Sequence, residues 1–438
     1  MAQFRTTADV LDLILTNGGE VTNGNSPYEA QVLNYLNRVQ FAIVCGGTIP
    51  LGKDQTIEID EVWPWAKAKR PLVLELQPKV ITGTVSLTQG SEAGTFSSGP
   101  AASLAGWYLR INGRSEILRI ASHTAAATAF ELDGAYPDTT GSTLSFEAFK
   151  LDYDLTPDYI VIDSTNNKFD FKKASGGALL TATLTAGTYS PSALATHVAA
   201  VVTTAASGPT ITGSYSAITK KFTFVSDGAA ASVFQLFFAT GTNQLQSAHK
   251  TLGYDDEDLT GALTYTSTYI QGGIARLIEP IRIHKANEGN IFGIDAESFQ
   301  RNYALNVVEE GAPDRFTIIS EESDGSLKVR FNRYVEEKTR IEIDHVPVPR
   351  DLKDSAGSIP LVPRKHVDVL EDAATFYLMF CKSDDRAMAY ANLAQGKLKA
   401  MVAQHRGSQV RSGENFGRVI SRRDRMSQRR GLFPREPY

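Results

Sequence analysis

Histidine and cysteine are the side chains best suited to bind a metal or to act as a nucleophile, so their spacing is considered first. The seven histidines are His123, His197, His249, His284, His345, His366 and His405. No two of them stand at a metal-ligand spacing, and the HExxH, CxxC, GxSxG and Walker A patterns are missing from the sequence. We therefore expect no catalytic residue, no metal site and no cofactor, and we predict that the chain is not an enzyme.

Three other groups of residues could bind a ligand. The run Asp255-Asp256-Glu257-Asp258 could hold calcium, but it lacks the alternating ligands of a calcium loop, so a solvated acidic loop is preferred. Trp63 and Trp65 could form a sugar-stacking platform, although a packed anchor between the helices and the first strand is preferred. Cys45 and Cys381 lie in apolar segments, and we expect two buried thiols rather than a disulfide.

Arginine is concentrated at the carboxyl end of the chain. Residues 406–438 hold nine arginines and three acidic residues, a net charge of +6, whereas the rest of the chain has a net charge of −11. With few apolar side chains, this tail cannot form a core. Arginines beside aromatic anchors favour a protein partner, with DNA phosphates or a solvated end as alternatives. The candidate binding residues are Arg418, Arg422, Arg423, Arg425, Arg429, Arg430, Leu432, Phe433 and Tyr438.

The composition limits the class of protein. With 42% hydrophobic and 21% charged residues, the chain is typical of a folded, water-soluble protein. No run of about 18 or more apolar residues occurs, so we expect no membrane span. The amino-terminal segment lacks the apolar stretch of a signal peptide, which predicts a cytoplasmic start. A length of 438 residues predicts two or three domains.

Helical patterns mark both ends of the chain. Thr6 or Thr7 can cap a first helix, and Ser26 can cap a second because Pro27 and a glutamate follow it. Residues 364–381 and a helix after Asp384-Asp385 form a second pair. Each pair buries only one stripe, so we expect the two αα-hairpins to pack into one four-helix layer.

Strand patterns fill the middle of the chain. Between residues 72 and 149, apolar residues alternate between turns such as Asn112-Gly113 and Asp133-Gly134, which predicts an antiparallel barrel or sandwich. Residues 163–270 form a second β-rich block, with one helix that starts at Ser190-Pro191. Polar flanks indicate that this block is inserted into a host domain.

Together these patterns predict an α+β fold: a helical layer from the N- and C-terminal αα-hairpins, a central antiparallel β barrel or sandwich, an inserted β-rich domain and an extended basic C-terminal tail. The predicted segments are an N-terminal helical hairpin (1–70), a β module (71–162), an inserted β-rich domain (163–273), a β segment of the host domain (274–350), C-terminal helices (351–405) and the basic tail (406–438).

This order of segments resembles the head-to-tail adaptor (connector) proteins of tailed bacteriophages. The stretches that carry the resemblance are residues 6–11 with 35–38, residues 82–91 with 107–111 and 118–120, residues 151–159, and residues 359–366. The resemblance covers most of residues 1–160 and 274–438. Residues 163–270 are an addition that smaller adaptors lack, and they look like β domains found on phage tail and fibre proteins.

The resemblance implies a virion protein of the head–tail junction, made in the host cytoplasm. It implies a ring of copies of this chain, usually dodecameric, beneath the portal protein. Such a ring continues the DNA channel, through which DNA passes without specific binding, and offers a platform for nozzle, tube or fibre proteins. The helical layer and the tail would contact the portal, which would make the tail residues portal-binding. The alternative is a tail fibre or receptor-binding subunit whose β domain recognises host-surface glycans.

Overall fold

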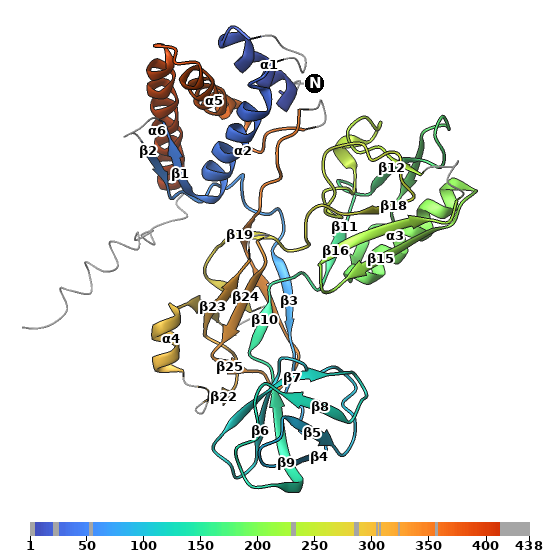
Figure 1. Cartoon of the computed structure of the whole chain (residues 1–438). Helices are drawn as coiled ribbons and strands as arrows, with labels where there is room; N and C mark the ends of the chain where they lie inside the picture. The colour runs from blue at the N-terminus through green and yellow to red at the C-terminus, as the bar shows by residue number, and fades with distance from the viewer. Residues whose placement is uncertain are drawn as a thin grey trace, which may run out of the picture. The chain divides into compact units, whose positions relative to one another are not determined.

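The computed structural model describes the chain except for residues 1–4, 21–25, 52–55, 229–233, 284–288, 304, 306–307, 323–324, 355–357 and 412–438. The chain divides into two compact units (Figure 1). We call them the β unit, residues 1–9 and 66–361, and the helical unit, residues 10–65 and 362–438. The α+β class predicted from the sequence is confirmed, with six α-helices among the described residues.

The helical unit is built from both ends of the chain. Its helices are α1 (Thr7–Asn17), α2 (Glu29–Cys45), α5 (Val367–Cys381) and α6 (Ala387–Arg411), with a hairpin of β1 (Gly47–Pro50) and β2 (Thr56–Ile59) and a 3-10 turn, η3 (Arg364–His366). Helix α5 packs against both α2 and α6. It is therefore the middle helix, which explains why most of its side chains are buried.

Local signals explain where these helices begin and end. Thr6 caps α1: its hydroxyl accepts a hydrogen bond from the Asp9 amide, and the Asp9 carboxylate accepts one from the Thr6 amide. Gly19, with φ +70°, ends α1 because this left-handed conformation suits glycine. The predicted cap of α2 at Ser26 is wrong. The Ser26 carbonyl accepts a bond from the Glu29 amide, which makes a turn, and α2 begins only at Glu29.

The β unit contains a closed six-stranded barrel, which decides between the predicted barrel and sandwich. Its order is β4-β5-β8-β7-β6-β9, and all neighbouring strands are antiparallel. The strands are β4 (Thr84–Leu87), β5 (Ala93–Phe96), β6 (Tyr108–Ile111), β7 (Ile117–His123), β8 (Ala129–Leu132) and β9 (Gly141–Phe149). The turn at Asn112-Gly113 joins β6 to β7, as its sequence predicts.

The β unit also contains a seven-stranded sheet, whose strands precede and follow the barrel in the sequence. Its strand order is β10-β24-β23-β21-β20-β26-β3. The strands are β3 (Leu72–Leu76), β10 (Asp152–Asp154), β20 (Ile281–Ile283), β21 (Asn290–Gly293), β23 (Arg315–Glu321), β24 (Leu327–Phe331) and β26 (Thr339–Ile343). The sequence placed β3 with the barrel, but β3 pairs with β26. Strand partners distant in the sequence cannot be read from an alternating pattern, which is the same for either sheet.

The seven-stranded sheet and the smaller elements around it, within residues 66–80, 150–159 and 274–361 of the β unit, are called the sheet domain. Two short pairs are formed by β19 (Ile274–Leu277) with β27 (His345–Pro347) and by β22 (Glu309–Glu310) with β25 (Arg333–Tyr334). Helix α4 (Ala296–Asn302) starts where the sequence predicts, because the Asp295 side chain accepts a bond from the Ser298 amide.

A buried polar cluster joins the barrel to the sheet. The Arg330 guanidinium on β24 donates to both carboxylate oxygens of Asp152, at 2.7 and 2.9 Å. The Tyr108 hydroxyl on β6 donates to the same carboxylate at 2.8 Å. Because the Asp152 side chain is 4% exposed, these bonds are shielded from water. The barrel strand β6 is thus tied to the sheet strands β10 and β24.

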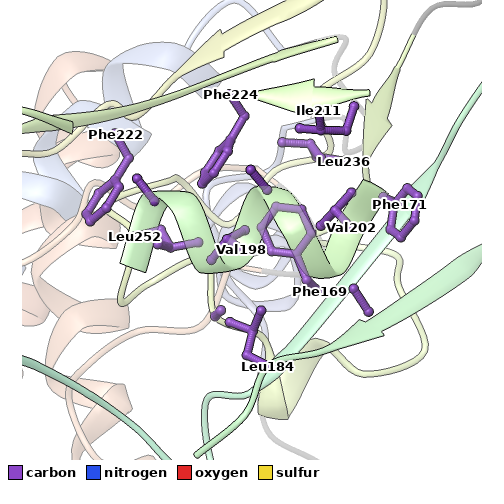
Figure 2. Close-up of a cluster of buried hydrophobic side chains, with 14 of the residues drawn as sticks. Phe169, Phe171, Leu184, Val198, Val202, Ile211, Phe222, Phe224, Leu236 and Leu252 are labelled. Atoms are coloured by element: carbon purple, nitrogen blue, oxygen red, sulfur yellow. The ribbon is translucent and has the colours of Figure 1, made fainter. Parts of the chain in front are cut away.

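The inserted domain has its own hydrophobic core, made of residues between Ile160 and Tyr265. Its elements are β11 (Ile160–Ile162), β12 (Lys168–Lys172), β13 (Leu180–Thr183), β14 (Gly187–Tyr189), α3 (Pro191–Ala206), β15 (Ile211–Ser216), β16 (Lys221–Ser226), β17 (Gln235–Leu236), η1 (Gln244–Gln246) and β18 (Thr264–Thr266). Figure 2 shows apolar side chains gathered around α3. Ser190 caps α3 with Pro191 behind it, as predicted.

Candidate interaction surface on the helical unit

The contact between α2 and α5 is centred on two stacked tyrosines. The rings of Tyr35 and Tyr377 lie 4.3 Å apart with 4° between their planes. The Tyr35 hydroxyl donates to the Pro50 carbonyl at 2.6 Å, which ties α2 to β1. Burial raises the pKa of Tyr35, so its hydroxyl remains a neutral donor. The stack thus holds α2 and α5 in a fixed register.

Exposed side chains continue from this stack along both helices. Arg38 is exposed on α2, and its charge acts on the hydroxyls of Tyr35 and Tyr377. Phe41 lies one turn beyond Arg38 and is 48% exposed, and Phe380 lies one turn beyond Tyr377 and is 55% exposed. We call this set of residues on the two helices, the exposed Arg38, Phe41 and Phe380 and the partly buried Tyr377, the aromatic surface.

The chemistry available to the aromatic surface is protein docking. Tyrosine and arginine are enriched among the residues that dominate binding energy at protein interfaces. Two phenylalanine rings are about half exposed, and their burial under a partner would lower the free energy of the complex. The sequence alone does not reveal this surface, because Tyr377 falls at the apolar spacing of α5, which predicts a buried position.

The two cysteines have different environments, and the expectation of two buried thiols is wrong for one of them. Cys45 is buried, and burial raises the pKa of its thiol to about 12. Cys381 is exposed at the last turn of α5. Both are free thiols, as the sequence predicts. Cys381 escapes burial because it follows Tyr377 by one turn and shares its outward side of the helix.

Trp63 is an anchor inside the helical unit. Its ring is 1% exposed, its indole N–H donates to the Ile43 carbonyl at 2.7 Å, and the His405 ring lies 5.0 Å away. The Trp65 ring stacks on it at 5.7 Å. A ring so buried cannot stack on a sugar, so the alternative of a sugar platform at Trp63 is wrong.

The start of the arginine-rich segment is fixed beside this anchor. Arg406 makes an ion pair with Glu61, with its Nε 2.7 Å from the carboxylate, and His405 lies 3.8 Å from the same side chain. Helix α6 continues to Arg411, so the predicted tail boundary at residue 406 is too early. The candidate portal-binding residues, which begin at Arg418, lie outside the described residues and remain a prediction.

Ion pairs of Lys397 connect α6 to α5. The Lys397 ammonium lies 2.6 Å from the Asp372 carboxylate and 3.4 Å from that of Asp368. Burial opposes the charge of Lys397, but the two carboxylates outweigh burial and raise the pKa of its ammonium. Lys382 similarly binds Glu20 at 2.6 Å, which joins the ends of α5 and α1.

The acidic run of the inserted domain is engaged in internal contacts. Asp256 contacts His249 at 2.5 Å and Lys250 at 3.0 Å, and Asp258 accepts bonds from the amides of Ala239 and Thr240. The predicted solvated loop is therefore wrong for Asp255, which is 4% exposed, and for Asp256. Among the described residues, no group of three or more histidine, cysteine or acidic side chains could hold a metal ion.

The other described histidines make ordinary structural contacts. The His123 ring accepts a bond from the Leu104 amide at 3.0 Å, and the His197 ring accepts one from the Thr185 amide at 3.1 Å. The His345 ring lies 3.2 Å from the Ile343 carbonyl. His366 precedes α5 as its cap residue without a side-chain bond to the helix, and His284 lies outside the described residues.

The sequence has no match among models of known protein families, and no curated protein is significantly similar to it. In the described part of the chain, no helix is both long and apolar enough to cross a membrane. The protein therefore has an α+β fold, and its helical unit, formed by segments near both ends of the sequence, exposes the aromatic surface.

Proposed function

We propose that this chain is a structural subunit of a tailed bacteriophage that forms the adaptor ring between the portal and the tail. The observation that carries the proposal is the helical unit, in which helices from the first 65 and the last 77 residues pack together, the aromatic surface is exposed, and the arginine-rich segment begins. The proposal also rests on the resemblance of residues 1–160 and 274–438 to adaptor proteins.

In the proposed ring, the helical unit docks on the portal. The aromatic surface supplies apolar contact area, and the arginines after α6 supply charge-assisted bonds to carboxylates of the portal. The barrel and the sheet domain, tied through Arg330 and Asp152, form the body of the ring. Tail proteins dock on that body, and DNA passes through the ring without specific binding.

Particle stoichiometry tests this proposal. Quantitative mass spectrometry of purified virions should give copies of this chain in a one-to-one ratio to the portal protein, and labelled particles should show it only at the head–tail junction. A trimer-based ratio, or label at the far end of the tail, would contradict the adaptor.

One observation supports a second candidate, a receptor-binding role of the inserted domain. The outer face of the sheet β15-β16-β18 carries hydroxyl side chains in register, with Ser214 opposite Thr223 and Thr223 opposite Thr266. Such a face can hydrogen-bond the hydroxyls of a glycan. Glycan-array binding by the full chain, lost in Thr223→Val and retained in Thr196→Val on the exposed side of α3, would support this role.

A further inference from the structure

The inserted domain and the sheet domain meet through polar groups. Their apolar cores have no residue in common among the described residues: one core runs from Ile160 to Tyr265, and the other consists of sheet residues such as Ile274 and Ile341. Separating the two domains would therefore leave both cores intact. Domains joined through small polar contacts are expected to move relative to each other.

Arg350 is the centre of the contact between these domains. It lies after β27 in the sheet domain, and its guanidinium donates to the Lys250 carbonyl of the inserted domain at 2.7 Å. The same guanidinium lies over the Tyr269 ring, 5.0 Å from its centre. The neighbouring Asp351 amide donates to the Tyr269 hydroxyl at 3.0 Å. Arg350 and Asp351 thus contact the inserted domain at two positions, Lys250 and Tyr269.

Two further charged pairs connect the same two domains. The Lys353 ammonium lies 3.9 Å from the carboxylate of Asp255, which is 4% exposed. Arg70 of the sheet domain makes an ion pair with Asp163 at the start of the inserted domain. Because both pairs involve opposite charges on different domains, salt should weaken the contact.

The two connecting segments cross at one point, which gives the inserted domain a pivot. A Cβ atom added to Gly272 would lie 2.8 Å from both the Leu155 carbonyl oxygen and Pro157 Cδ, and Gly272 has φ +80°. The outgoing and returning segments therefore touch. A domain attached at one place can rotate about it once its other contacts open.

We propose that the inserted domain is a hinged arm, docked on the sheet domain by the Arg350 contact and released from it reversibly. The docked state is held by charged and polar groups that water can solvate on release. The arm then rotates about the crossing at Gly272 without unfolding. This proposal does not depend on the adaptor function.

Single-molecule energy transfer on the full chain tests the arm. The labels are placed at Ile218→Cys, 92% exposed in the inserted domain, and at Glu336→Cys, an exposed position of the sheet domain. The exposed Cys381 is replaced by serine, and the buried Cys45 is retained. We expect a narrow distribution at low salt and a broad one at about 1 M salt, where charges are screened beyond about 3 Å.

Two variants separate docking from stability. Arg350→Leu should raise the ratio of released to docked molecules about tenfold at low salt, because a charge-assisted bond and a cation–π contact are lost. Arg301→Leu is the matched control, because this arginine is on α4 of the same domain and its side chain is 72% exposed. Its distribution should equal that of the parent chain.

Calorimetry of the same variants at about 1 M salt, where the arm is released in both chains, completes the test, and the inserted domain of Arg350→Leu should then unfold at the parent temperature. An unchanged distribution in Arg350→Leu would overturn the proposal. So would a parent chain insensitive to salt. A lower unfolding temperature of the inserted domain in Arg350→Leu at about 1 M salt would show that Arg350 stabilises the fold of the domain rather than its docking, and would also overturn the proposal.

Discussion

Removing the Asp152 carboxylate should destabilise the β unit strongly. In Asp152→Ala, the Arg330 guanidinium loses both of its carboxylate bonds, and the Tyr108 hydroxyl loses its acceptor. Breaking a buried ion pair by removing one partner costs about 3–5 kcal/mol. The Arg330 side chain is 26% exposed, so water can hydrate part of the unpaired guanidinium. We therefore expect a loss near the lower end, about 3 kcal/mol.

Two further variants divide this free energy of unfolding. Tyr108→Phe removes the hydrogen bond that the hydroxyl donates to Asp152 and the one that it accepts from Arg330, and it should cost about 2 kcal/mol. The double variant Asp152→Ala, Arg330→Met leaves no unpaired charge, so it should be less destabilised than the sum of its single variants, by about 2 kcal/mol. This coupling energy between the two substitutions would identify a charge pair, because the free-energy costs of two independent packing defects would simply add.

Urea unfolding measures these differences. Trp107 is buried in the barrel core and reports on the β unit, whereas Trp63 and Trp65 report on the helical unit. Only the transition of the β unit should move, and the midpoint of the helical unit should stay constant. A cost below about 1 kcal/mol for Asp152→Ala, or strictly additive single variants, would refute the reasoning.

Four other predictions concern the inserted domain, the tail and assembly. Burial lowers the pKa of His249 below its usual 6.5. The unfolded chain then takes up the proton more readily, so the stability of the inserted domain should fall from about pH 6.5 downward, and calorimetry of His249→Phe should show a weaker fall. Residues 160–273 expressed alone should unfold in one cooperative calorimetric transition, and a gradual loss of structure would contradict an independent domain. Deleting residues 421–438 should leave the circular dichroism spectrum unchanged but abolish binding to the portal in surface plasmon resonance. Phe433→Ala, which removes about 2 kcal/mol of burial, should weaken this binding more than any single Arg→Ala. If the truncated chain binds the portal with unchanged affinity, the tail does not contribute to docking. Sedimentation should show monomers without portal, because a body of net charge −11 repels its copies, and stable closed rings would argue against templated assembly.

Signals confined to a few residues predicted structure well. The serine–proline pair at Ser190 and the aspartate at Asp295 each start a helix where expected. The glycine turn at Asn112-Gly113 forms its hairpin. In each case the physical cause, a side-chain cap or a left-handed backbone, lies within about four residues of the position it controls.

Features that depend on distant partners were harder to predict. Strand β3 alternates like a barrel strand, yet its partner β26 lies more than 260 residues away. Tyr377 falls at the apolar spacing of its helix, which predicts a buried position, but it stacks on Tyr35 and is only partly buried. The aromatic surface was missed for this reason, and the predicted tail residues lie outside the described residues.

The crossing of residues 155–157 and 272 has a consequence for protein engineering. Since the chain leaves and re-enters the sheet domain at neighbouring points, a gap there can be closed by a short linker with little loss of chain entropy. The inserted domain can therefore be exchanged for any domain whose own ends lie close together. Each such chimera would present its foreign domain at this one attachment site, which makes the remaining host a scaffold for multivalent display wherever its copies assemble.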